Sequence, residues 1–168
     1  MTSRSLTSDE IALAASMFGG AIDYDAVRLH VRKYWPFHRP RVTMAPDGHL
    51  WFHPLGRTYC EDFCAGSLSL QGHFIHEMTH VWQAQTRGKY YLPLMRHPWC
   101  RYDYTLRPDR PFARYGIEQQ AEIVRHAFLY RRGIAPGGAP PHEALEALLP
   151  FIPASSPRPQ ARDAASAP

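Results

Sequence analysis

Cysteine is scarce in this chain of 168 residues. The three cysteines, Cys60, Cys64 and Cys100, are too few for a disulfide scaffold, and their odd number favours a reducing compartment. Cys60 and Cys64 have a spacing compatible with metal binding, but the sequence offers no second pair to complete a structural site. We therefore expect both to be ordinary thiols.

Long apolar runs are also missing. No stretch approaches the ~18 apolar residues of a membrane span. The N-terminus has no charged segment followed by an apolar one and begins with a polar, capped helix pattern instead. These absences argue against a membrane partner and predict a cytoplasmic protein.

Acidic residues are outnumbered, so the net charge is +4 and the pI is about 9.1. Such a balance suits acidic partners. The arginines are nevertheless spread along the chain, with one dense basic group at Arg28, Arg32, Lys33, Arg39 and Arg41. We interpret this group as a solvated face. Because no stacking motif of a known nucleic-acid module is present, binding to nucleic acid ranks last among the expected functions.

The sequence does contain an HExxH pattern, His76-Glu77-Met78-Thr79-His80. Residues four apart lie one above the other on a helix, so His76 and His80 can bind one Zn²⁺. Zinc lowers the pKa of a bound water to about 7, and Glu77 is placed to accept its proton as the general base. The alternative is a buried helix whose histidines bond to backbone carbonyls.

A catalytic zinc site needs a third protein ligand. The best candidate is Glu118, at the start of the next strong helical pattern. It shares one helical face with Ala121, Glu122 and Arg125. Ala121 is small enough to let two helices approach, and Glu122 would then accept the outer N–H of a ligand histidine. Two alternatives stay open: Glu122 as the ligand, or surface pairing among Glu118, Glu122 and Arg125.

The sequence leaves two questions open near the metal: the role of His73 and the identity of the oxyanion donor. His73 lies on the face of the two motif histidines and is an alternative ligand, a partner of one, or simply a polar residue of that face. A donor that stabilises the oxyanion is also expected beside the metal. We place Tyr104 first and Tyr115 second for this role, and core packing is the alternative for each. The other candidates in the same stretch are Tyr102 and His97.

The hydrophobic pattern predicts one α+β domain over residues 1–152, followed by a disordered tail rich in Pro, Ala and Ser at 153–168. Helices are predicted at about 8–18, 70–85, 117–131 and 142–149, a strand at 26–31, an irregular segment at 90–98, and a loop or short strand at 101–106. Strands at 41–45 and 49–53 flank Asp47-Gly48, which predicts a hairpin. We expect a small antiparallel sheet over the HExxH helix, with the glutamate-bearing helix packed behind it.

His76-Glu77-x-x-His80 followed by Glu118-x-x-Ala121-Glu122 resembles the gluzincin pattern of zinc peptidases. The resemblance implies a zincin-like fold in which His76, His80 and Glu118 bind the metal, Glu77 is the base, and a strand above the helix binds extended substrate. This chain departs from the pattern at Glu122, where thermolysin-like members have an aspartate. More closely, segments 49–54, 76–83 and 115–124 are similar to small bacterial vgr-related proteins and to the short metallopeptidase-like domain found with contractile injection systems.

The sequence thus predicts a zinc-dependent metalloendopeptidase that acts on a peptide or on a flexible protein segment. The first alternative is a catalytically silent zinc-binding accessory module of a secretion or injection system, with a secretion-system partner. The second alternative is a DNA-associated protease that uses the basic group.

Overall fold

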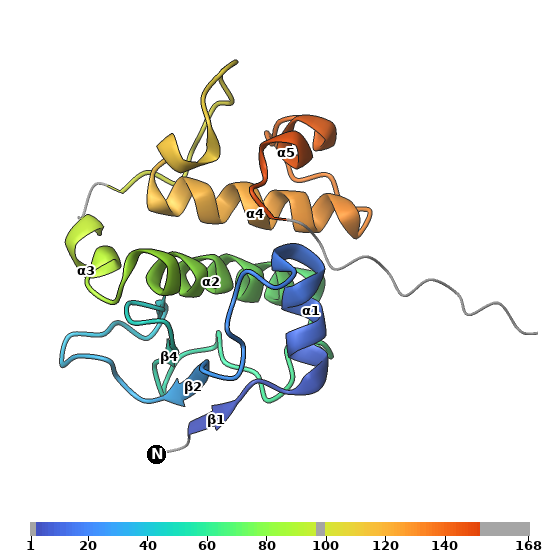
Figure 1. Cartoon of the computed structure of the whole chain (residues 1–168). Coiled ribbons are helices and arrows are strands. Elements are labelled where there is room, and N and C mark those ends of the chain that lie inside the picture. Colours follow the sequence, from blue (N-terminus) through green and yellow to red (C-terminus); the bar gives the residue numbers. More distant parts are fainter. Residues whose placement is uncertain (1–2, 97–99, 152–168) are drawn as a thin grey trace, which may run out of the picture.

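The computed structural model describes residues 3–96 and 100–151, which form an α+β arrangement. The predicted tail at 153–168 lies outside these residues. The elements, in chain order, are β1 (Ser3–Ser5), α1 (Ser8–Phe18), β2 (Arg28–Val31), β3 (Thr43–Met44), β4 (Leu50–Phe52), α2 (Leu68–Arg87), α3 (Tyr91–Met95), the 3₁₀ helix η1 (Phe112–Arg114), α4 (Ile117–Arg131) and α5 (His142–Leu148). Figure 1 shows α2 in the middle, with α4 along one side and the sheet on the other.

The four-stranded sheet has the order β1-β2-β4-β3. It is mixed, which corrects the expectation of an antiparallel sheet: β1 pairs with β2 and β3 pairs with β4 in antiparallel fashion, but β2 and β4 run parallel. The physical reason is the connection between Val31 and Thr43. It carries the chain past the position of β4 before β3 forms, so that β4 returns between β2 and β3. As a result, β3 is an edge strand.

The predicted hairpin is confirmed by the pairing of Thr43 with Phe52 and of Met44 with Trp51. Its turn depends on Asp47, whose Oδ1 accepts hydrogen bonds from the backbone N–H of His49 (3.2 Å) and from Nε1 of Trp51 (2.9 Å). Gly48 has a φ of 89°, a conformation that glycine adopts without steric cost. The Asp-Gly pair therefore sets both the turn and the register of the two strands.

The first helix is fixed by a capping box in which Thr7 and Glu10 bond to each other's backbone N–H. Glu10 is fully buried. Its two carboxylate oxygens also accept hydrogen bonds from Arg4 of β1, at 2.7 and 2.8 Å. This pair ties the edge of the sheet to α1.

The two long helices pack closely because small residues lie between them. A Cβ on Gly72 of α2 would lie 3.4 Å from Leu129 and 3.5 Å from Arg125 of α4. Ala121 is fully buried, as expected for a residue at a helix contact. The surrounding core includes Phe63, Phe74, Ile75, Met78, Ile123, Val124 and Phe128. This packing places one face of α4 against the HExxH face of α2.

The four predicted helices are confirmed. They are α1, α2, α4 at Ile117–Arg131, and α5. Two segments differ from the prediction. The short helix α3 forms where a loop was expected, with Pro93 inside its single turn, and β1 adds a strand that the sequence pattern did not indicate. Residues 101–106 contain no strand.

Candidate metal centre

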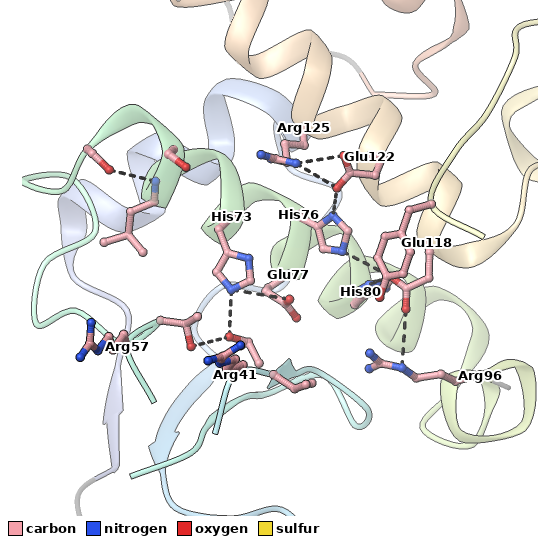
Figure 2. A pocket seen from close by; sticks show the side chains of 17 residues that line it. Arg41, Arg57, His73, His76, Glu77, His80, Arg96, Glu118, Glu122 and Arg125 are labelled. Carbon is pink, nitrogen blue, oxygen red and sulfur yellow. Dashed lines mark hydrogen bonds and ion pairs between the residues drawn. The ribbon is translucent and has the colours of Figure 1, made fainter. Parts of the chain in front are cut away.

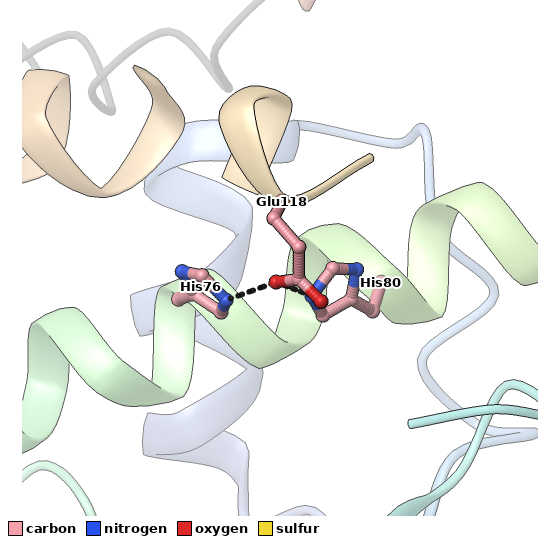
Figure 3. Close-up of side chains that lie close together, drawn as sticks. All are labelled: His76, His80 and Glu118. Atoms are coloured by element: carbon pink, nitrogen blue, oxygen red, sulfur yellow. Dashed lines mark hydrogen bonds and ion pairs between the residues drawn. The ribbon is translucent and has the colours of Figure 1, made fainter. Parts of the chain in front are cut away.

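His76, His80 and Glu118 meet between α2 and α4. The Nε2 atoms of His76 and His80 lie 3.3 and 3.1 Å from Oε2 of Glu118, and one ligand atom from each residue falls within 4.8 Å of the others (Figure 3). All three side chains are buried. Within residues 3–96 and 100–151, this is the one group of three or more His, Cys, Asp or Glu side chains that converges in this way.

The donor set fits zinc. Two imidazole nitrogens and one carboxylate oxygen are a ligand set of catalytic zinc sites, which leave a further position open. Oε1 of Glu118 is buried without a hydrogen-bond partner, although Nε of Arg96 lies 3.6 Å away. A buried carboxylate oxygen that lacks a hydrogen bond is costly unless a cation or a ligand satisfies it. The triad therefore has the chemistry of a metal site.

Each histidine is oriented by a hydrogen bond at its outer nitrogen. The structure places Oε1 of Glu122 2.8 Å from Nδ1 of His76, the geometry expected for Glu122 (Figure 2). Nδ1 of His80 lies 2.8 Å from Oε1 of Gln83. Gln83 in turn donates to the backbone carbonyl of Ile117, at 3.1 Å. Such contacts fix the tautomer and the ring orientation of metal-binding histidines.

Sequence reasoning missed the role of Gln83. The available signal was its position three residues after His80 on the same helix, which places the two side chains on neighbouring positions of one face. Gln83 is 1% exposed, a low value for a glutamine, and its amide also donates to Oε1 of Gln120 at 2.9 Å. A glutamine held in this way links the HExxH helix to the start of α4.

The carboxylates around the histidines shift the local proton equilibria. Burial by itself lowers the pKa of His76, but hydrogen bonds with Glu118 and Glu122 outweigh it and raise the pKa to about 9. Burial acts in the opposite sense on Glu118, whose pKa is nevertheless held well below its usual range by His76 and His80. Protons would therefore compete with a metal ion at this site, since a ligand histidine must be neutral.

Glu77 lies beside the triad and lines the same cavity, which has a volume of about 640 Å³. Its Oε2 atom is buried without a hydrogen-bond partner. Nε2 of His73 lies 3.8 Å from its Oε1 atom (Figure 2). His73 also bonds to Oγ1 of Thr43 at 2.8 Å, so the structure places it beside Glu77 and outside the converging triad.

The two tyrosines favoured for oxyanion stabilisation lie elsewhere. Tyr104 bonds through its hydroxyl to Nδ1 of His126 at 2.7 Å, and the buried Tyr115 accepts a hydrogen bond from the backbone N–H of Arg107 at 3.2 Å. Neither is among the residues that line the cavity, whereas Tyr102 is. Tyr102 is 49% exposed and stacks on His76 with ring centroids 6.1 Å apart. His97 lies outside the described residues.

Cys60 and Cys64 lie outside this site. Neither forms a disulfide within the described residues. Burial raises the pKa of the Cys64 thiol to about 11, so it is protonated at neutral pH. No helix in the described part of the chain has the length and apolar character needed to cross a bilayer.

The fold and the site define an α+β domain with a candidate metal centre between two packed helices. No protein-family model matches the chain. The chain is 42% identical over 133 residues to the type VI secretion system spike protein VgrG2b of Pseudomonas aeruginosa, an alignment that covers 75% of this chain and 13% of the spike protein. It is also similar to the solved effector domain of VgrG2b, with a TM-score of 0.67, 35% identity, and coverage of 86% of this chain and 80% of that domain.

The chain belongs to the family of the VgrG2b effector domain. The vgr-related resemblance noted in the sequence is thereby confirmed. This chain spans only 13% of the length of the spike protein, so the similarity concerns one domain of that larger protein.

Proposed function

We propose that this domain is a zinc-dependent peptidase with a zincin-like active site. The observation that carries the proposal is the convergence of His76, His80 and Glu118 beside Glu77, whose Oε2 atom is buried without a hydrogen-bond partner. A structural site closes all four metal positions with protein ligands, whereas three ligands beside a carboxylate suit a hydrolytic site. The cavity gives a substrate access to these groups.

Each group would have a distinct role. His76, His80 and Glu118 would hold the ion, with Glu122 and Gln83 fixing the orientation of the two rings. Zinc, when bound, acts as a Lewis acid and lowers the pKa of water to about 7. Glu77 would accept a proton from the attacking water at its carboxylate and then deliver it to the nitrogen of the leaving amine. Water thus supplies the hydroxyl of the new acid and the proton of the new amine.

Tyr102 would donate its hydroxyl to the oxyanion. It replaces Tyr104 and Tyr115 in this role because it lines the cavity and stacks on His76. Burial raises the pKa of Tyr102, so its hydroxyl keeps the proton that it would donate. A donor directed at the position where negative charge develops stabilises the transition state more than the bound substrate.

The edge strand β3 would hold the substrate in an extended form. Thr43 and the two residues before it line the cavity, and β3 pairs with β4 alone in the sheet order. An extended peptide can add to a sheet edge through backbone hydrogen bonds. A zincin-like fold requires such an edge strand beside the metal centre.

The test is hydrolysis of a quenched fluorescent peptide library by zinc-loaded protein, beside Glu77→Gln. We expect turnover by the wild type and a loss of at least about 100-fold in the variant, because proton transfer by a positioned carboxylate contributes that much. The variant should keep its zinc, because Glu77 is not a ligand. Turnover that survives in Glu77→Gln would contradict the proposed role.

A second candidate function is supported by family membership. The relative is a spike protein of a type VI secretion system, and its solved domain is an effector domain. We propose on that ground that this domain works together with such a system. If zinc is bound and no peptide is cleaved under any condition, a catalytically silent module of the secretion apparatus becomes the better account. Co-purification with a spike protein, compared between wild type and Glu77→Gln, tests that association independently of catalysis.

A further inference from the structure

The cavity beside the candidate metal centre is lined by one more arginine than glutamate. Four arginines line it, Arg41, Arg57, Arg96 and Arg125, against the three glutamates of the site. Two of the arginines are engaged: Nε of Arg96 lies 3.6 Å from Glu118, and Nη1 of Arg125 lies 3.0 Å from Glu122. These two balance the carboxylates that hold the histidines. Arg41 and Arg57, the other two arginines, have no carboxylate partner among the described residues.

Arg41 and Arg57 lie in the segments just before β3 and just after β4. Figure 2 shows them on the His73 and Glu77 side of the cavity, away from Glu118. Among the residues that the structure describes, neither guanidinium forms an ion pair with a carboxylate. Both residues are exposed, so their side chains are accessible to a ligand. The cavity therefore has one end with balanced charge and one end with surplus positive charge.

The backbone beneath these arginines is held in place. Oγ1 of Thr43 donates to Oγ1 of Thr58 at 2.9 Å and lies 2.8 Å from Nε2 of His73. These bonds join the segment that carries Arg41, the segment that carries Arg57 and the HExxH helix. Ser67 and Ser69, at the N-terminus of α2, line the same cavity. The positive end of the helix dipole adds to the field of the arginines.

We propose that Arg41 and Arg57 form a subsite that binds a carboxylate of the peptide substrate. A guanidinium presents paired N–H donors that match the two oxygens of a carboxylate. The carboxylate belongs either to an acidic side chain near the scissile bond or to the free C-terminus of a short peptide. This inference rests on the proposed peptidase function and adds a preference for acidic substrates.

The test compares three peptides that are otherwise identical: a C-terminal amide with Glu at one position, the same amide with Gln there, and the Gln peptide with a free C-terminus. We expect kcat/KM to be about tenfold higher for a peptide with the recognised carboxylate, the equivalent of one charge-assisted hydrogen bond. Whichever peptide gains identifies the source of the carboxylate. The gain should disappear in Arg41→Gln and Arg57→Gln and persist in Arg39→Gln, an exposed member of the same basic group that does not line the cavity.

Failure of the subsite and failure of the peptidase give different results. Equal cleavage of all three peptides by the wild type would overturn the subsite and leave the peptidase intact. If no peptide is cleaved, binding of the same peptides to zinc-loaded Glu77→Gln, measured by fluorescence polarisation, decides the matter. About tenfold tighter binding of a carboxylate-bearing peptide, lost in the Arg41→Gln and Arg57→Gln backgrounds, would support the subsite. Equal affinities would overturn it.

Discussion

Two buried clusters of charge in this molecule differ in how completely they are satisfied. Glu10 is fully buried, and its oxygens accept hydrogen bonds from Arg4 and from the backbone N–H groups of Thr7 and Phe63. Glu77 and Glu118 are almost as deeply buried, yet each keeps one carboxylate oxygen without a hydrogen-bond partner.

We propose that this difference separates a structural cluster from a ligand site. Native structures leave few buried polar atoms unpaired, because each one loses its hydration without compensation. At Glu10 the chain itself supplies every donor, so the cluster holds β1, α1 and the segment around Phe63 together. Beside the HExxH helix, Oε2 of Glu77 has no hydrogen-bond partner, and Oε1 of Glu118 has only the 3.6 Å ion pair with Arg96. The following experiments test that distinction, from the largest expected effect to the smallest.

Tyr102 and Tyr104 offer a second comparison, because Tyr102 lines the cavity and Tyr104 does not. If the domain is a peptidase, Tyr102→Phe should lower kcat about 100-fold, as expected when one oxyanion donor is removed. Tyr104→Phe should leave kcat nearly unchanged, because its hydroxyl is already bonded to His126. Steady-state kinetics on both variants makes the measurement, and an equal loss in the two would contradict the assignment.

Glu10→Gln should destabilise the fold by about 2–3 kcal/mol. Removing one charge of a buried pair costs about 3–5 kcal/mol, and the 23% exposure of the Arg4 side chain reduces that value. Denaturant unfolding of the zinc-free protein gives the free energy, and the exposed Glu61→Gln is the matched control. Zinc affinity should not change. If Glu10→Gln lost zinc without losing stability, the Glu10 cluster would not be the structural one, and the account would be contradicted.

Gln83→Ala should weaken zinc binding by about 10-fold to 100-fold, the usual effect of removing a group that orients a ligand histidine. Gln85→Ala provides the control on the same helix, since the Gln85 side chain bonds to the backbone of Asp23 instead. Competition with a fluorescent zinc chelator measures both affinities. Equal affinities would show that His80 needs no support from Gln83.

The smallest effect is the loss of the Glu10 contribution in acid. Burial raises the pKa of Glu10, but hydrogen bonds from Arg4 and the backbone outweigh it and hold the pKa below its usual 4.5. A carboxylate with a lowered pKa stabilises the fold fully above its unfolded pKa and less as the pH falls through its folded pKa. The stability difference between wild type and Glu10→Gln should therefore be constant above pH 4.5 and shrink below it. A difference that grows in acid would contradict this account.

The parts of the site that were predictable from the sequence depend on local spacing. His76 and His80 are four apart on one helix, and Glu118 and Glu122 are four apart on another, so each pair shares a face wherever the helices pack. The hairpin followed from Asp47-Gly48 in the same way. A local pattern determines which side chains project together, and the packing of α4 on α2 brings the two pairs into contact.

What escaped prediction depends on contacts between distant segments. β1 has three residues, too few for an alternating pattern, and it exists because it pairs with β2. The parallel pairing of β2 with β4 depends on the path of the chain between them. Tyr102 and Tyr104 have the same chemistry two residues apart, and only the tertiary course of the segment decides which one reaches His76.

The most direct test of the central claim is the zinc content of the purified protein after reconstitution, for wild type, His76→Ala, Glu118→Ala and the exposed control Glu143→Ala. The account predicts about one zinc ion per chain in the wild type and in Glu143→Ala, and little or none in the two ligand variants. Zinc retained at full occupancy in Glu118→Ala, or absent from the wild type, would contradict the three-residue metal centre.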